Sequence, residues 1–204
     1  MLPTNKPMKR LSLYLFLILF TLQTPSWADD IRDFQIEGIS VGDSALDYFT
    51  EEEIEEGEKI FYEYNKFVTV LFYKHPSLKV YDSVSVIYKP NDKKYKIYGV
   101  EGTLYFRNNI IDCYKKQDDI VSELSKLFEN EAKINTYTGK HRDDKSGNSK
   151  YTVTDFDFKT GSGVRVICYD WSEKMTEKNR WYDSLLVVIN SAEFMNFLKD
   201  LANE

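Results

Sequence analysis

Three β-rich segments between residues 64 and 106 are joined by very short turns, and this limits the possible folds more than any other feature of the chain. "FVTVLFY", "YDSVSVIYK" and "YKIYGVEGTLYF" carry β-branched and aromatic residues in partial alternation, which is typical of half-buried strands. "HPS" at 75–77 and "PND" at 90–92 are turn sequences. Because such short connections join antiparallel strands, we expect a meander, with a bulge at Gly99 and Gly102.

The sequence changes to a helical period after these strands. In "DCYKKQDDIVSELSKLFENEA" apolar residues recur at spacings of three, four and seven, and charged residues occupy the other face. We therefore expect a helix over 112–131 that lies on the sheet, with Asp112 as its N-cap and Cys113 on the buried side. The polar stretch 133–150 shows no period and is predicted to be a long mobile loop.

The second half of the chain repeats this plan. "YTVTDFDFK", "VRVICYDW" and "SLLVVIN" predict three more strands, and "SAEFMNFLKDL" predicts a closing helix over 191–202 capped by Ser191. Near the start, Ser44 and Thr50 each precede an acid by three residues, a capping-box pattern that predicts two short helices. The expected fold is α+β: two short N-terminal helices, then an antiparallel sheet of about six strands with two packed helices, in the order βββα-βββα.

The first 28 residues have the order of a secretory signal. Lys6, Lys9 and Arg10 precede the apolar run "LSLYLFLILFTL", and Ser26-Trp27-Ala28 supplies small residues at the cleavage positions. The run is shorter than the roughly 20 residues that a membrane-spanning helix needs. We therefore expect a signal peptide at 1–28, a single α+β domain at 29–204, no membrane span after cleavage, and a periplasmic or secreted protein.

The charge of the chain argues against nucleic acid as a partner. The full sequence has a formal net charge of −6, from 27 basic and 33 acidic residues. The predicted signal peptide contains three of the basic residues and no acidic residue, so its removal makes the chain still more acidic. Phosphate binding depends on Lys and Arg, so nucleic acid and anionic lipid are poor candidates.

Two cysteines, Cys113 and Cys168, lie 55 positions apart in a chain that we expect to be exported. An oxidising compartment favours a disulfide between them, and two free buried thiols are the alternative. A bridge across a loop of this length stabilises the fold by roughly 4 kcal/mol in the chain-entropy model. Neither cysteine has the neighbours of a catalytic thiol.

Several chemistries are poorly supported by the residues present. The glycines of "GISVG", Gly38 and Gly42, lack the lysine and the spacing of phosphate or dinucleotide loops, and we interpret them as an entry turn. Only His75 and His141 could join the cysteines as zinc ligands. "DKSGNS" from Asp144 lacks the downstream Glu of a calcium loop. We expect no metal and no cofactor.

The best candidate for a binding surface is "CYDWSEKMTEKNRWYDS". Its rings, Tyr169, Trp171, Trp181 and Tyr182, flank a polar loop between two strands, where they would stack on a sugar or anchor a partner protein. The alternative is that Trp171 and Trp181 form a cross-strand pair that holds the hairpin together. We add His141 and Arg142, from the polar stretch 133–150, to the candidate binding residues.

The strings "FQIEGISVGDSALDYF", "KIYGVEGTLYF", "DCYKK", "DIVSEL" and "VICYDWS" give the chain a resemblance to a family of uncharacterised secreted proteins from AT-rich marine alphaproteobacteria. The likeness covers nearly the whole mature chain and implies a Gram-negative envelope location. The fold plan is also similar to periplasmic α+β modules of the outer-membrane assembly lipoprotein and β-lactamase-inhibitor type. The chain departs from the former because it has no lipidated cysteine.

These observations favour a non-enzymatic periplasmic module that binds an envelope protein or a small ligand. The alternative is a cell-envelope hydrolase that acts on glycan or cell-wall substrates through Asp155, Asp157 or His141. Asp155 and Asp157 share one strand face, as paired carboxylates of glycosidases do, but "TDFDF" also suits a half-exposed strand. An inhibitor of a periplasmic enzyme is a third possibility.

Overall fold

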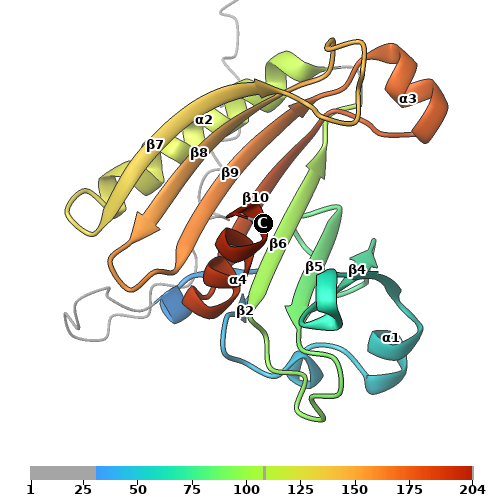
Figure 1. Cartoon of the computed structure of the whole chain (residues 1–204), viewed down its shortest axis with the longest axis vertical. Helices are drawn as coiled ribbons and strands as arrows, with labels where there is room; N and C mark the ends of the chain where they lie inside the picture. The colour runs from blue at the N-terminus through green and yellow to red at the C-terminus, as the bar shows by residue number, and fades with distance from the viewer. Residues whose placement is uncertain (1–30, 108, 204) are drawn as a thin grey trace, which may run out of the picture.

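The computed structural model describes residues 31–107 and 109–203, and its central element is one antiparallel sheet of eight strands (Figure 1). The strand order is β3-β4-β5-β6-β10-β9-β8-β7. The bounds are β3 (Glu58–Phe61), β4 (Val68–Tyr73), β5 (Ser83–Tyr88), β6 (Gly99–Tyr105), β7 (Ala132–Lys140), β8 (Lys150–Phe158), β9 (Gly163–Asp170) and β10 (Ser184–Asn190). A separate two-stranded sheet pairs β1 (Gln35–Ile36) with β2 (Ile39–Ser40) around Gly38.

Two long helices lie on opposite faces of the sheet (Figure 1). The helix α2 (Ile110–Leu127) connects β6 to β7 and covers the face that we call the α2 face. The helix α4 (Ala192–Asn203) follows β10 and covers part of the other face, the α4 face. Two short helices, α1 (Glu51–Glu56) and α3 (Glu173–Asn179), lie outside these layers. Within the described residues, no helix is long and apolar enough to cross a membrane.

The α2 face contains most of the core. Cys113, Gln117 and Ile120 are the buried positions of α2, and their spacing of four and three residues places them along one side of the helix. They pack against strand residues such as Val166 and Leu185, both fully buried. The buried amide of Gln117 donates to the carbonyl oxygens of Thr152 (2.8 Å) and Val166 (3.1 Å), so this polar side chain is satisfied inside the core.

A disulfide ties α2 to the sheet. Cys113, in the first turn of α2, is bonded to Cys168 of β9, and their Cα atoms are 6.2 Å apart. Both side chains are fully buried. The structure thus places the two cysteines at bonding distance, as their predicted pairing requires.

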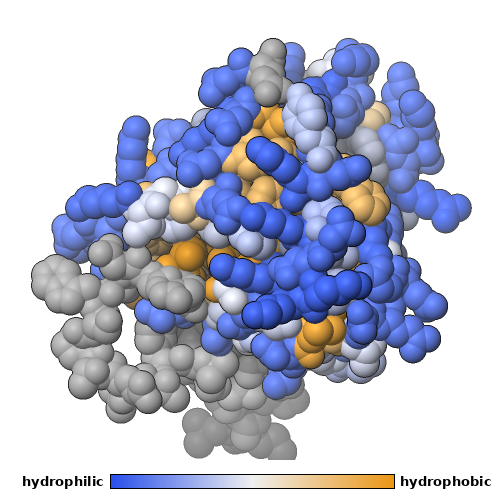
Figure 2. All heavy atoms as spheres, turned by 60° about the horizontal axis from the view of Figure 1, so that its bottom comes forward, coloured by the Kyte–Doolittle hydropathy of each residue, from blue (hydrophilic) through white to orange (hydrophobic). Residues whose placement is uncertain are grey.

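The α4 face is covered only in part. Phe194 and Phe197 of α4 pack in a cluster of aromatic rings with Phe67 and Tyr98, and Ile87 of β5 lies beneath them. Figure 2 turns the lower end of the molecule forward and shows hydrophobic side chains in separate patches among hydrophilic ones.

The predicted α+β fold with an antiparallel sheet is confirmed, but six strands are too few. Edge strand β3 was not predicted, and it begins where the second N-terminal helix was expected to continue; that helix ends at Glu56 because Gly57 turns the chain. A Cβ on Gly57 would lie 2.5 Å from Val70 Cγ2, so the close approach of β4 requires glycine here. The prediction of a long mobile loop over 133–150 is also wrong, because most of this stretch forms β7 and its turn.

The helices differ in detail from the prediction. Thr50 and Glu53 make the full capping box of α1, but Ser44 caps only a 3₁₀ turn over Ala45–Asp47. The helix α2 begins two residues earlier than expected, with Asn109 rather than Asp112 as N-cap. Ser191 accepts a bond from the N–H of Phe194, which supports its predicted capping role.

The predicted bulge in β6 is absent, since its pairing with β5 and β10 runs without interruption. Gly102 has a different role. A Cβ there would lie 2.7 Å from the ring of Tyr81, so glycine allows that buried ring to lie flat on the strand.

Removal of the disulfide is expected to destabilise the fold. The double variant Cys113→Ala/Cys168→Ala should lose up to about 4 kcal/mol of unfolding free energy, because its unfolded chain is no longer closed into a loop. Urea unfolding, compared with wild type before and after reduction, measures this. Equal midpoints for the oxidised and reduced wild-type protein would contradict a stabilising bridge.

Candidate functional site

The upper part of the α4 face has no helix over it and carries polar and aromatic side chains. The strand register aligns these residues in three rows that run from β6 to β7 across the sheet. The first row is Glu101, Val188, Arg165, Asp155 and Asn135; the second is Thr103, Leu186, Ile167, Val153 and Tyr137; the third is Tyr105, Ser184, Tyr169, Tyr151 and Gly139. Residues that are distant in sequence are thus brought onto one surface.

A recess of about 350 Å³ lies over β7, β8 and β9 on this surface. We call it the tyrosine recess. Val153 and Ile167, both buried, form its apolar floor. The remaining lining residues are three tyrosines and four residues with nitrogen-containing side chains: Tyr137, Tyr151, Tyr169, Lys140, His141, Arg142 and Arg165. Neighbouring tyrosine rings are close together: the ring centroids of Tyr137 and Tyr151 are 6.3 Å apart, and those of Tyr151 and Tyr169 are 6.4 Å apart.

His141 is fixed at the upper rim of the recess by aromatic rings. Its ring centroid lies 4.4 Å from that of Trp171 and 5.7 Å from that of Tyr169. The ring of Trp181 packs against that of Trp171 at 4.6 Å. The two tryptophans therefore contact each other, but outside β9 and β10 rather than as the cross-strand pair of the structural alternative, and they support His141 from the side away from the recess.

The six predicted binding residues separate into three groups. Tyr169, His141 and Arg142 line the tyrosine recess, and Trp171 and Trp181 stand behind His141. Tyr182 lies apart from them, with the guanidinium of Arg107 4.8 Å from its ring centroid. Sequence reasoning did not find Tyr137, Tyr151 and Arg165, because only the strand register brings them beside Tyr169.

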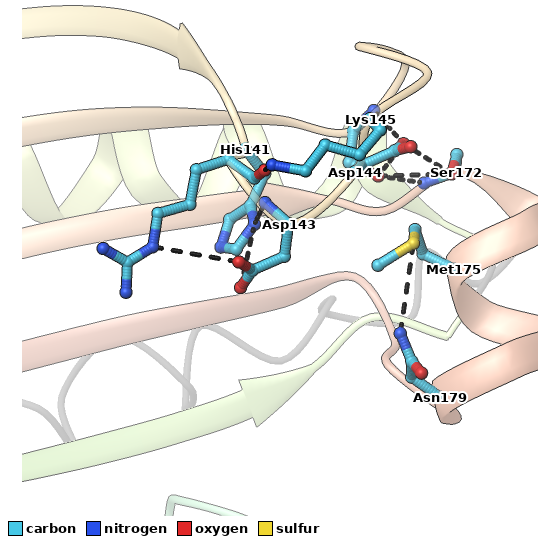
Figure 3. Close-up of polar contacts among 9 residues, drawn as sticks. His141, Asp143, Asp144, Lys145, Ser172, Met175 and Asn179 are labelled. Atoms are coloured by element: carbon cyan, nitrogen blue, oxygen red, sulfur yellow. Dashed lines mark hydrogen bonds and ion pairs between the residues drawn. The ribbon is translucent and has the colours of Figure 1, made fainter.

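Asp144 holds the β7–β8 turn against the start of α3 (Figure 3). Its carboxylate accepts hydrogen bonds from the N–H and hydroxyl of Ser146 and of Ser149, and from the hydroxyl of Ser172 at 2.9 Å. These bonds, the Ser146 hydroxyl first, hold the pKa of Asp144 well below its usual range. The carboxylate oxygens are thus occupied by donors of the loop itself, which fixes the position of His141.

Arg165 and Asp155 form an ion pair at the lower end of the recess. The Nε and Nη2 groups of Arg165 donate to the two carboxylate oxygens of Asp155, a two-point arrangement that orients both side chains. The charge of Arg165 is therefore offset within the protein. Lys140 has no ion pair among the described residues, and the largely exposed Arg142 is 3.8 Å from Asp143.

The three residues of the hydrolase hypothesis do not converge. Asp155 is engaged by Arg165, Asp157 is exposed at the far end of the same strand, and His141 lies at the opposite end of the sheet. Within the described part of the chain, no group of three His, Cys, Asp or Glu side chains is placed to hold a metal ion.

Glu101 is a titratable group of this face that sequence reasoning missed. Burial raises the pKa of its carboxyl group to about 7, against a single weak hydrogen bond from the Thr103 hydroxyl at 3.5 Å. Its surroundings include the buried side chains of Ser83 and Ser85. The Glu101 carboxyl also contributes to the raised pKa values of three tyrosines: Tyr62, Tyr105 and Tyr169. Glu101 does not line the recess, but it lies two strands from Tyr169, whose pKa is raised by burial first and by the Glu101 charge second.

Comparison of the chain with protein-family models, with curated proteins and with solved structures finds no match.

The burial of Glu101 predicts a specific pH dependence of stability. Because the folded pKa is about 7 and the usual value is about 4.5, the unfolded chain loses its proton first as the pH rises. The free energy of unfolding should fall by about 3 kcal/mol between pH 4.5 and 7 through this group. Glu101→Gln should remove that part of the slope, measured by urea unfolding at several pH values.

The control is Glu177→Gln, an exposed carboxylate on α3, which should leave the slope unchanged. If Glu101→Gln unfolds with the same pH dependence as wild type, the carboxyl group of Glu101 titrates at an ordinary pH and the argument from burial is wrong.

Proposed function

We propose that the protein is a non-enzymatic binding module of the bacterial envelope, and that its ligand or partner places an anionic group in the tyrosine recess. The observation that supports this most directly is the composition of the recess: an apolar floor, three tyrosine rings and the cations Lys140 and Arg142 at one rim. None of its lining residues is acidic, although the whole chain has a net charge of −6.

This combination of groups defines the ligand chemistry. Tyrosine rings offer flat surfaces for stacking and hydroxyl groups for hydrogen bonds, which suits a sugar or another ring. A local excess of positive charge on an acidic protein concentrates anions at that place. Lys140 would provide it together with Arg142, which is only loosely paired with Asp143 at 3.8 Å, whereas Arg165 is engaged at two points by Asp155. A ring that bears a carboxylate combines both properties.

Binding is favoured over hydrolysis by the positions of the carboxyl groups. Glycosidases use two carboxyl groups about 5 to 9.5 Å apart. Glu101, whose raised pKa is the one feature that supports a general acid, is three strands from Asp155, or about 14 Å at the usual strand spacing. Asp155 is also held by Arg165. The hydrolase therefore remains the second candidate, with Glu101 rather than Asp155 as its acid.

The proposed envelope location is supported by the signal peptide predicted at 1–28, which lies outside the described residues. The disulfide between Cys113 and Cys168 is consistent with an oxidising compartment. The resemblance to secreted alphaproteobacterial proteins supports the same location. The partner would then be another envelope protein or a small ligand present there.

The recess is expected to bind galacturonate better than galactose. The two sugars have the same ring and differ by the carboxylate, so the difference between their affinities measures the contribution of charge to binding. Arg142→Glu should weaken galacturonate binding at least about fivefold, the effect of reversing one exposed charge. Chemical-shift titration by NMR measures affinity and location together.

The matched control is Lys178→Glu, an exposed lysine on α3 that makes the same change in net charge. It should bind galacturonate as wild type does. Equal binding of galactose and galacturonate, or shifts centred away from the recess, would contradict the proposal.

Export is tested by the N-terminus of the mature protein. When the full chain is produced in a Gram-negative host, intact mass spectrometry of the periplasmic fraction should show a protein that begins at Asp29. The protein should also be lighter by two hydrogen atoms than its reduced form. A full-length chain in the cytoplasm with both thiols free would oppose the proposal.

A further inference from the structure

The strand β7 is a long and regular edge of the sheet. Its nine residues pair with β8 without a bulge, from Ala132 opposite Phe158 to Lys140 opposite Lys150. Among the described residues, no strand pairs with its other side, and six consecutive residues of β7 are exposed (Figure 1). The opposite edge of the sheet, β3, has only four residues.

The register shows which backbone groups of β7 point away from the sheet. The N–H of His141 donates to the carbonyl oxygen of Ser149 at 2.9 Å, and these residues continue the β7–β8 register. In an antiparallel pair, hydrogen-bonded positions alternate with positions whose N–H and C=O point outward. The outward positions are therefore Ile134, Thr136, Thr138 and, at the end of the strand, Lys140.

Several common protections of edge strands are absent from β7, and its only charged residues are two lysines. Proline, a bulge, or a very short strand prevents most edges from pairing with another chain. β7 contains no proline, bulge or covering element among the described residues. Its charged residues, Lys133 and Lys140, lie near its two ends.

The charge of this edge selects the kind of segment that would pair with it. The sequence from Ala132 to Arg142 contains Lys133, Lys140 and Arg142 and no acidic residue. The edge is also continuous with the candidate site, because Tyr137 and Lys140 of β7 line the tyrosine recess. An extended segment beside β7 would have every second side chain on the α4 face, close to that recess.

We propose that β7 is a docking edge for an extended, acidic segment of a partner protein, which adds as a ninth strand and places a carboxylate in the tyrosine recess. This inference rests on the proposed function of the recess and identifies its ligand as part of a protein. The backbone of the segment bonds to Ile134, Thr136 and Thr138, and alternate acidic side chains lie on the α4 face, at the part of the recess that His141 and Arg142 line.

The probe is the peptide acetyl-Thr-Glu-Val-Glu-Val-Glu-Thr-amide, with a counterpart in which lysine replaces each glutamate. Thr136→Pro removes an outward N–H and leaves the β7–β8 hydrogen bonds in place, since proline is tolerated at such edge positions. It also removes the bond between the hydroxyls of Thr136 and Thr154 (2.9 Å). Thr136→Val loses that bond and keeps the N–H, so it is the matched control.

The glutamate peptide should bind wild type and Thr136→Val with similar affinity, and Thr136→Pro about tenfold more weakly, whereas the lysine peptide should not bind. In wild type, the peptide should slow hydrogen exchange at the N–H groups of Ile134, Thr136 and Thr138. This measurement needs no variant, so it tests the proposal even if Thr136→Pro fails to fold.

Three results would overturn the proposal: no binding of the glutamate peptide, equal binding to Thr136→Pro, or no protection of the outward N–H groups. Galacturonate binding distinguishes a failure of the β7 proposal from a failure of the proposed function. Thr136→Pro keeps the tyrosine recess, so this variant should still bind galacturonate. Self-association of wild type that Thr136→Pro abolishes would identify a second copy as the occupant, and an acidic partner would then be wrong.

Discussion

The packing of α2 on one face of the sheet determines what the other face can present. Once the disulfide and the buried side of α2 fix Cys168 and Val166 toward the helix, strand alternation turns Arg165, Ile167 and Tyr169 to the α4 face. A shift of β9 by one residue would bury Arg165 under α2 and expose Val166. The tyrosine recess thus depends on the core behind it.

The kind of side chain on the α4 face changes from one end of the sheet to the other. At the lower end, Phe194 and Phe197 of α4 close the sheet with aromatic rings. Small polar side chains such as Ser83 and Ser85 occupy the middle strands around Glu101, and the upper end has the tyrosine recess. The apolar side chains that this face does carry, such as Val188 and Ile167, are already buried by their neighbours on the sheet, so the upper part stays open without a helix over it.

The sequence predicts elements well where one side of an element is buried. β4, β8, β9 and β10 have apolar or β-branched patterns, and the two cysteines meet as expected. Both edge strands were missed, because β3 and β7 are exposed on both sides and have no apolar face to produce alternation. The helix α3 was missed because it is short and Met175 is its single buried residue.

The candidate site could be predicted only in part, for a physical reason. Aromatic residues near Trp171 were recognisable in the sequence, but a surface across β7, β8 and β9 exists only once the register is known. Register depends on long-range packing, and it is what aligns Tyr151 with Tyr169 and brings Tyr137 beside them. Glu101 was missed similarly, since an isolated acid in a strand is usually exposed.

The register also explains how β7 can serve both the recess and an added strand. Ile134, Thr136 and Thr138 direct their backbone groups outward and their side chains to the α2 face. Odd-numbered residues such as Tyr137 bond to β8 and direct their side chains to the α4 face. Pairing at the edge therefore uses backbone groups that the recess does not need. Asp144 keeps the adjoining turn in place, so that His141 and Arg142 stay at the rim whether or not the edge is occupied.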